Sequence, residues 1–271
     1  MTKNSDQLNI INAEHLHTAI DHQGVATITL TRAKVRNAFS ADTINHLLTT
    51  LAVLKHDSAV KILILRAQGE HFSAGADIKW MKDIAKLGYQ DNLSDAVQLA
   101  KLMDKLNQFP KPTIALVQGA CFGGAIGLVA CCDIALATTT AKFCLSEVKI
   151  GLIPAVISPY VVAAIGPRQA RRYCLTGEVF SAEQGLEYGL IHQIHDDLDT
   201  LSTPFINALL NNGPAAMQAA KALINDITNH VINDTLIADT SQRIAAIRVS
   251  NEAQEGLDAF LNKRKPDWSK E

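Results

Sequence analysis

The sequence lacks the features that mark membrane, secreted or nucleic-acid-binding proteins. Its longest apolar stretch, Ala125 to Ala137, is interrupted by Asp133 and is too short to span a bilayer. The polar residues 1–11 carry no signal-peptide pattern. Lysine and arginine total 25 against 27 aspartates and glutamates, so no global charge would hold a polyanion. We therefore expect neither a membrane nor a nucleic acid as a partner.

Metal-binding patterns are also missing. Three histidines near the N-terminus, His15, His17 and His22, have no carboxylate or cysteine partner at ligand spacing, so we expect no metal site. The cysteines are odd in number, lie mostly in apolar surroundings and follow no zinc-site spacing: Cys121, Cys131, Cys132, Cys144 and Cys174. This usage is typical of buried thiols in a reducing compartment, which predicts a cytoplasmic protein.

What the sequence does contain is an alternation of strand-like and helix-like segments, followed by helices alone. Hydrophobic residues make up 48% of the 271 positions, enough for a sizeable core. The predicted strands are Val25–Thr31, Lys61–Ala67, Thr113–Gln118 and Asp133–Ala137, with helices at Ala41–His56, Leu93–Gln108 and Gly124–Cys131. Further helices are predicted at Leu201–Asn211, Pro214–His230, Asp234–Arg248 and Ala253–Lys263. The pattern indicates an α/β core over residues 1–200 and a helical region over residues 201–271.

Two loops rich in small residues each follow a predicted strand and precede a helix. The first is residues 71–78, His-Phe-Ser-Ala-Gly-Ala-Asp-Ile, and the second is residues 118–127, which include Gly123 and Gly124. Small residues let a ligand approach the backbone closely, and free amides at a helix start can hold an anion or a developing oxyanion. The second loop lacks the GxGxxG and GK[ST] spacings of nucleotide-binding loops.

These loops and four further segments resemble the crotonase (enoyl-CoA hydratase/isomerase) superfamily, in the family's order and over essentially the whole chain. The matching segments are residues 36–39, 72–78, 123–124, 130–135, 143–154 and 256–264. The resemblance implies a crotonase (ClpP-like) β-β-α spiral with two roughly perpendicular sheets. It also implies that residues 201–271 form a C-terminal trimerisation region, giving a homotrimer or a hexamer of two trimers.

By the same resemblance, the backbone N–H groups of Ala76 and Gly124 match an oxyanion hole that stabilises a thioester enolate. Coenzyme A would be part of the substrate, and no separate cofactor is expected. The resemblance assigns coenzyme contacts to Arg36, Ala38, Ala74, Asp77, Ile78 and Lys263, the last approaching the phosphates from a neighbouring subunit.

Glu147 is the expected acid/base. Taken alone, it could be an exposed glutamate paired with Lys149, but the resemblance matches it to a catalytic glutamate. The family's second catalytic glutamate falls on Gly127. Because a glycine would vacate the volume of that side chain, we expect Gly127, with Pro154 and Val156, to shape the acyl pocket.

Residues 127–133 and 145–160 resemble bacterial hydratases of the methylglutaconyl-CoA and isohexenylglutaconyl-CoA (carboxygeranoyl-CoA) type. This favours hydration of a branched, dicarboxylic 2-enoyl-CoA. Two alternatives stay open. One is an enoyl-CoA isomerase that uses Glu147 as its single base. The other is a non-catalytic acyl-CoA-binding protein on the same scaffold.

Overall fold

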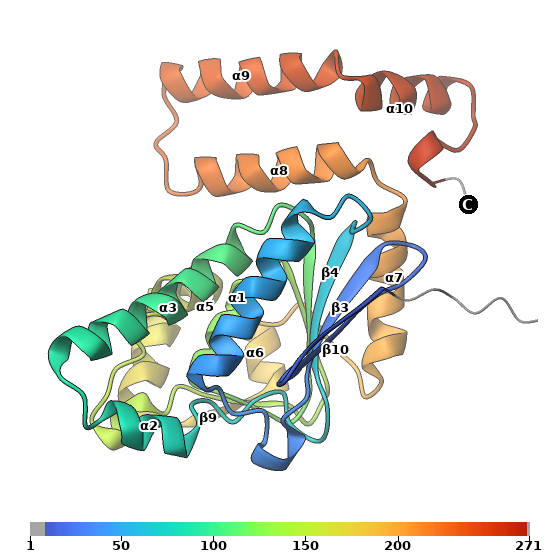
Figure 1. The fold of residues 1–271 in the computed structure, drawn as a ribbon. Helices are drawn as coiled ribbons and strands as arrows, with labels where there is room; N and C mark the ends of the chain where they lie inside the picture. Colours follow the sequence, from blue (N-terminus) through green and yellow to red (C-terminus); the bar gives the residue numbers. More distant parts are fainter. Residues whose placement is uncertain (1–8, 270–271) are drawn as a thin grey trace, which may run out of the picture.

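The computed structural model describes residues 9–269, which form an α/β core with a layer of helices set apart from it (Figure 1). A seven-stranded sheet runs in the order β1-β2-β3-β4-β5-β7-β10, and a three-stranded sheet in the order β6-β8-β9. The strands of the seven-stranded sheet are β1 (Asn9–Ala13), β2 (Leu16–Ile20), β3 (Val25–Leu30), β4 (Ile62–Ala67), β5 (Thr113–Val117), β7 (Ile134–Ala137) and β10 (Gln193–Ile194). The smaller sheet has β6 (Ala120–Phe122), β8 (Lys142–Cys144) and β9 (Val179–Ser181).

The large sheet begins antiparallel and continues parallel. β1, β2 and β3 pair antiparallel, whereas the pairings from β3 to β10 are all parallel. Both faces of the parallel part are buried, which explains why β4 reads as an unbroken apolar run from Ile62 to Leu65. Leu63 and Leu65 join one apolar cluster, while Ile62 and Ile64 join the cluster on the opposite face.

The helices connect the strands and then continue alone. They are α1 (Ala41–His56), α2 (Ile78–Ile84), α3 (Tyr89–Asn107), α4 (Gly124–Ala130), α5 (Ser158–Thr176), α6 (Ala182–Tyr188), α7 (Leu198–Leu210), α8 (Pro214–Ile227), α9 (Asp234–Arg248) and α10 (Asn251–Leu261). Short 3-10 turns are η1 (Ala33–Val35), η2 (Glu147–Ile150) and η3 (Asp267–Ser269). The predicted α/β class with C-terminal helices is confirmed.

The helix that spans the predicted boundary near residue 200 packs against the core. Apolar side chains of α7, among them Leu201 and Phe205, lie against the outer face of the sheet. The layer that stands apart therefore consists of α8, α9 and α10 (Figure 1). Lys221 on α8 ties this layer to the core, since its Nζ lies 2.7 Å from Oδ2 of Asp133, which also accepts hydrogen bonds from Thr113.

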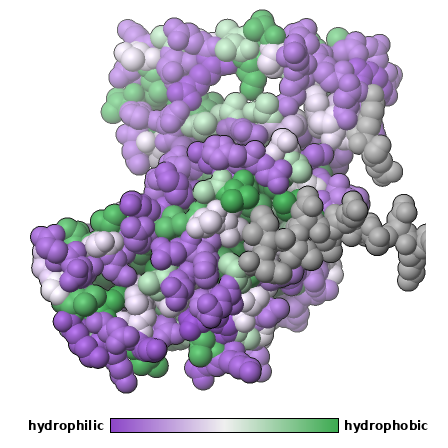
Figure 2. All heavy atoms as spheres, viewed as in Figure 1, coloured by the Kyte–Doolittle hydropathy of each residue, from purple (hydrophilic) through white to green (hydrophobic). Residues whose placement is uncertain are grey.

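Apolar side chains reach the surface of this helical layer, as the hydropathy colours of Figure 2 show. They include Val249 at 77% exposure, Phe260 at 79% and Leu261 at 69%. α8 has no buried residue, nor has α9. A single chain thus leaves much of the apolar surface of these helices uncovered.

Candidate functional site

The first loop carries a backbone amide that faces an open cavity. A short bridge joins Phe39 to Ala76: the N–H of Phe39 donates to Gly75 O, and the N–H of Asp77 donates to Phe39 O, each at 2.8 Å. Ala76 itself lines the cavity. Within residues 9–269, its N–H donates to no other group. The bridge therefore fixes the loop and leaves this donor available.

The second loop carries another available amide at the start of α4. Gly123 has a φ of +55°, and its N–H donates to Cys144 O at 2.9 Å, which turns the chain into the helix. The first N–H groups of a helix have no partner within it, and Gly124 is the first residue of α4. Gly124 lines the same cavity as Ala76, beside the ring of Phe39. The two predicted oxyanion donors thus border one space.

Glu147 supplies the only carboxylate among the described residues that line this cavity. It lies at the start of η2, its Oε2 is buried without a hydrogen-bond partner, and no ion pair of the described residues joins it to Lys149. Burial raises the pKa of Glu147 above its usual 4.5, while a hydrogen bond within the residue acts in the opposite direction. A raised pKa makes the ionised carboxylate a stronger base than an ordinary glutamate, which suits a group that transfers protons.

The cavity has a volume of about 410 Å³ and an almost wholly apolar lining. Its walls come from α2, α3 and the segment before α5. The lining residues besides those above are Trp80, Met81, Ile84, Ala85, Asn92, Ala96, Leu99, Leu152, Ile153, Pro154, Ala155, Val156 and Ile157. Asn92 is engaged in the chain turn, because its Nδ2 donates to the carbonyls of Leu87 and Gly88. None of the described lining side chains is cationic.

Pro154 and Val156 line the same cavity as Glu147, whereas Gly127 does not. A Cβ atom at Gly127 would lie 2.3 Å from Cγ2 of Ile157 and 3.1 Å from Sδ of Met103. The expectation that Gly127 leaves free volume in the pocket is wrong, because the Ile157 and Met103 side chains already occupy that volume.

The residues predicted to contact coenzyme A lie on adjoining loops. The N–H of Ala74 donates to Arg36 O at 2.9 Å, Arg36 is exposed, and Ile78 is 68% exposed. Ala38 is buried next to Phe39. Residues 36–38 and 74–78 thus form one rim beside the Ala76 amide.

Asp77 on the same rim has a structural task. Its carboxylate caps α2 through the N–H groups of Lys79 and Trp80 and pairs with Arg32 at 2.9 Å. Burial acts to raise the pKa of Asp77, but the hydrogen bonds from Arg32, Trp80 and Lys79 and the Arg32 charge hold it below its usual value. Arg32 also donates to Ala38 O at 2.6 Å, so one guanidinium group joins both loops.

Lys263 follows α10 in the chain. α10 lies at the opposite end of the molecule from α2, whose residues line the cavity (Figure 1). Its predicted approach to the coenzyme from a neighbouring subunit stays a prediction.

Sequence reasoning missed Arg32 and the lining residues of α2 and α3. The apolar members of α2, Trp80, Met81 and Ile84, are spaced as one helical face and could have indicated a helix packed over a ligand. No pattern in the sequence marks Arg32, whose two partners lie 6 and 45 residues further along the chain.

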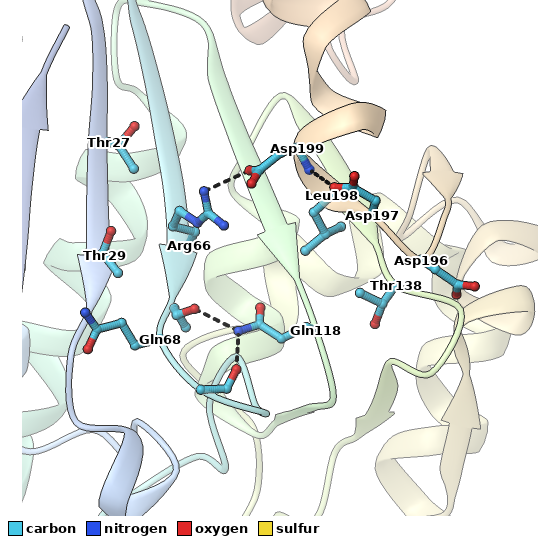
Figure 3. A pocket seen from close by; sticks show the side chains of 12 residues that line it. Thr27, Thr29, Arg66, Gln68, Gln118, Thr138, Asp196, Asp197, Leu198 and Asp199 are labelled. Atoms are coloured by element: carbon cyan, nitrogen blue, oxygen red, sulfur yellow. Dashed lines mark hydrogen bonds and ion pairs between the residues drawn. The ribbon is translucent and has the colours of Figure 1, made fainter.

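A second hollow, on the outer face of the sheet, is a weaker candidate (Figure 3). Its ionic groups already have partners: Arg66 pairs with Asp199 at 2.9 Å, Asp197 caps α7, and Asp196 accepts a hydrogen bond from Thr139. Gln118 donates to the carbonyls of Ala67 and Gly69. These bonds stabilise the end of the sheet, and the hollow does not combine free amides with an unpaired carboxylate.

No helix within residues 9–269 is long and apolar enough to cross a membrane. All five cysteines are free thiols, and four of them are buried, as predicted.

Comparison with known proteins agrees with the geometry. The chain is 51% identical to an enoyl-CoA hydratase of Shewanella pealeana, whose crystal structure it matches with a TM-score of 0.92 over 94% of this chain and 96% of that one. It is 29% identical to the 2,3-dehydroadipyl-CoA hydratase of Escherichia coli, covering 91% of this chain and 95% of the relative. A Dictyostelium discoideum protein, the mitochondrial Delta(3,5)-Delta(2,4)-dienoyl-CoA isomerase, is 28% identical over 91% of this chain and 88% of its own.

The family model described as enoyl-CoA hydratase/isomerase matches residues 21–271. Both hydratases and an isomerase are thus among the similar proteins, and the two loops with Glu147 lie inside the matched region. The chain belongs to the enoyl-CoA hydratase/isomerase family, the crotonase superfamily.

Proposed function

We propose that the protein hydrates a branched 2-enoyl-CoA, with Glu147 as its single acid/base. The observation that carries this proposal is the shared cavity of Ala76, Gly124 and Glu147, in which two available amides and one unpaired carboxyl group border the same apolar space. The coenzyme is part of the substrate, so the proposal needs no cofactor. The cysteine usage supports a cytoplasmic location.

The two amides would bind the thioester oxygen. As water adds to C3, the electrons of the double bond move onto the thioester, and the charge on its oxygen becomes that of an enolate. Donors held in place by the Phe39 bridge and the start of α4 stabilise that charge more than the neutral substrate.

Glu147 would handle both proton transfers. Its carboxylate takes one proton from water as the oxygen bonds to C3, and the resulting carboxylic acid gives a proton to C2. Water is thereby added across the double bond, and Glu147 returns to its starting state. A raised pKa suits both halves of this cycle, because the group must accept and then release a proton.

The predicted second carboxylate of the substrate has less support. The name of the Escherichia coli relative describes a dicarboxylic acyl group, and the resemblance of residues 145–160 favours one here. Yet the described lining offers no lysine or arginine to pair with it. A distal carboxylate would have to lie at the open mouth of the cavity, beyond Ile153, which is 74% exposed.

Isomerisation is the second candidate, and a specific observation favours it. With one lining carboxylate, the site has a single base, and a shift of the double bond in a 3-enoyl thioester needs only one group that moves a proton from C2 to C4.

A panel of thioesters in ¹⁸O-labelled water separates the two candidates. It would include crotonyl-CoA, 3-methylcrotonyl-CoA, 3-methylglutaconyl-CoA and a 3-enoyl-CoA. Hydration predicts loss of conjugation with label at C3, highest for a branched substrate. Conversion of the 3-enoyl-CoA without label would establish isomerisation instead. Turnover of none of these compounds would refute both.

A further inference from the structure

The inner wall of the cavity depends on a contact between Ile157, directly before α5, and Gly127 in the middle of α4. Ile157 is 2% exposed and lines the cavity, and its Cγ2 methyl lies where a side chain of Gly127 would begin. On the other side of that point is Met103 of α3, which is fully buried. The Ile157 side chain therefore fills a notch that exists only because residue 127 has no Cβ.

Ile157 has little freedom to leave this notch. Its carbonyl accepts hydrogen bonds from the N–H groups of Tyr160 and Val161 at the start of α5. Met103 is held in turn, since its Sδ lies 3.9 Å from Cys131 Sγ at the end of α4. In close-packed surroundings of this kind, an added carbon atom moves its neighbours rather than finding space.

We propose that Ile157, seated on Gly127, is the specificity-determining residue that closes the inner end of the acyl cavity. Its side chain ends the apolar space at α4, so it limits the length and branching of the acyl group that the cavity accepts. Ile157 also places an alkyl group where a side chain at residue 127 could otherwise supply the enzyme with a second carboxylate. This wall therefore favours an apolar acyl segment. The inference rests on the proposed acyl-CoA function.

Truncation of Ile157 tests the wall directly. Ile157→Ala opens the notch toward Met103, so octanoyl-CoA should gain affinity relative to butyryl-CoA by about ten-fold or more, because one methylene in an apolar pocket changes binding by about 10- to 200-fold. Saturated thioesters bind without turnover, and their dissociation constants are measured by calorimetry. Ile165→Ala is the matched control, since Ile165 is buried on α5 but does not line the cavity.

A change of less than about three-fold in this ratio, or an equal change in Ile165→Ala, would overturn the proposal. Gly127→Ala provides the complementary test. Its new methyl group should drive Ile157 into the cavity and weaken binding of both thioesters, whereas the double variant Gly127→Ala/Ile157→Ala should recover the affinity for butyryl-CoA. Absence of that recovery in a folded double variant would equally count against the role of Ile157.

These binding measurements are separable from the proposed reaction. If the wild-type chain binds saturated acyl-CoA and the ratio shifts as expected, the inference stands even where the enoyl-CoA panel shows no turnover. If turnover is found but the ratio does not respond to Ile157→Ala, hydration stands and the inference fails.

Discussion

At the scale of single residues, Glu147 combines two properties that oppose each other. Its ionised form is needed to accept a proton from water, yet burial makes that form costly in the folded protein. The residue is held in place by surroundings that do not neutralise it, since its Oε2 has no partner among the described residues. Such a group is expected at an active site and destabilises the fold that carries it.

This opposition predicts a pH-dependent gain in stability for Glu147→Gln. The folded pKa of Glu147 lies above the unfolded value, so the folded state binds more protons and the free energy of unfolding falls as pH rises through that window. The glutamine variant lacks this loss. Urea unfolding is measured at several pH values and at fixed protein concentration. The free energy of unfolding of Glu147→Gln should equal or fall below that of wild type under acid conditions and exceed it at neutral pH. A difference that does not vary with pH would contradict the raised pKa.

The absence of a side chain at Gly123 is predicted to leave the Glu147 carboxylate room to take its position. A Cβ at Gly123 would lie 3.1 Å from Oε1 of Glu147, on a backbone with φ of +55°. Gly123→Ala should displace the carboxylate and lower kcat by about 10- to 100-fold with a smaller effect on KM.

Gly166→Ala is the control for backbone strain alone. Gly166 has a φ of +72° with no atom within 4 Å of its would-be Cβ. The Gly166→Ala variant should lose stability but retain the wild-type kcat. Equal losses of kcat in both variants would show that Gly123 has no specific relation to Glu147.

At the scale of elements, the site depends on how two loops are joined. Arg32 bonds to Ala38 O in one loop and to Asp77 beside Ala76 in the other, and both members of the ion pair are partly buried. Its contribution should exceed that of an exposed pair, because solvent screens it less.

Arg32→Gln is expected to lower kcat by about ten-fold through loosening of the Ala76 amide, since displaced donors stabilise the enolate less well. Asp77→Asn should act similarly, although asparagine still caps α2. Arg66→Gln, which breaks the exposed pair with Asp199, is the matched control and should leave kcat unchanged. A kcat that is insensitive to Arg32→Gln would remove this guanidinium group from the positioning of the loop.

Sequence patterns predicted several long helices well, but they missed α5, the strands β1 and β2, and the walls of the site. Ala41–His56 and Asp234–Arg248 have the predicted bounds, because apolar periodicity and end signals agree there. β6, β8 and β9 were missed: each has three residues, too few for a periodic pattern.

The error at Gly127 has a different origin. An absent side chain in a sequence does not reveal which neighbour fills its volume, and Ile157 lies 30 residues further along the chain. Ala76, Gly124 and Glu147 could be placed because the resemblance fixed their order, but their shared cavity is visible only in the folded chain.

At the scale of the whole molecule, the helices α8, α9 and α10 expose apolar side chains that a second copy of the chain could cover. Phe260 and Leu261 at the end of α10 are highly exposed, and Lys263 follows them in the chain. α10 lies far from α2, the helix beside the cavity (Figure 1). If Lys263 contacts coenzyme phosphates, a second copy of the chain must bring it there. We therefore predict that association of copies and coenzyme affinity change together.

Phe260→Asp should yield smaller species in sedimentation and raise KM for the thioester, because a charge in an apolar interface disfavours association. Lys263→Ala should raise KM without changing the sedimentation and should make binding less sensitive to salt. Lys265→Ala serves as the control for general loss of positive charge. A smaller species of Phe260→Asp with wild-type KM would show that assembly does not supply the coenzyme contact.

The most direct measurement is the turnover of Glu147→Gln on the best substrate of the panel. The amide keeps the size of the side chain but cannot accept a proton from water, so kcat should fall by about 10²- to 10⁴-fold while the dissociation constant of a saturated acyl-CoA stays near the wild-type value. A variant that binds the thioester normally and retains about half of wild-type turnover or more would contradict the central claim that this one carboxylate moves the protons.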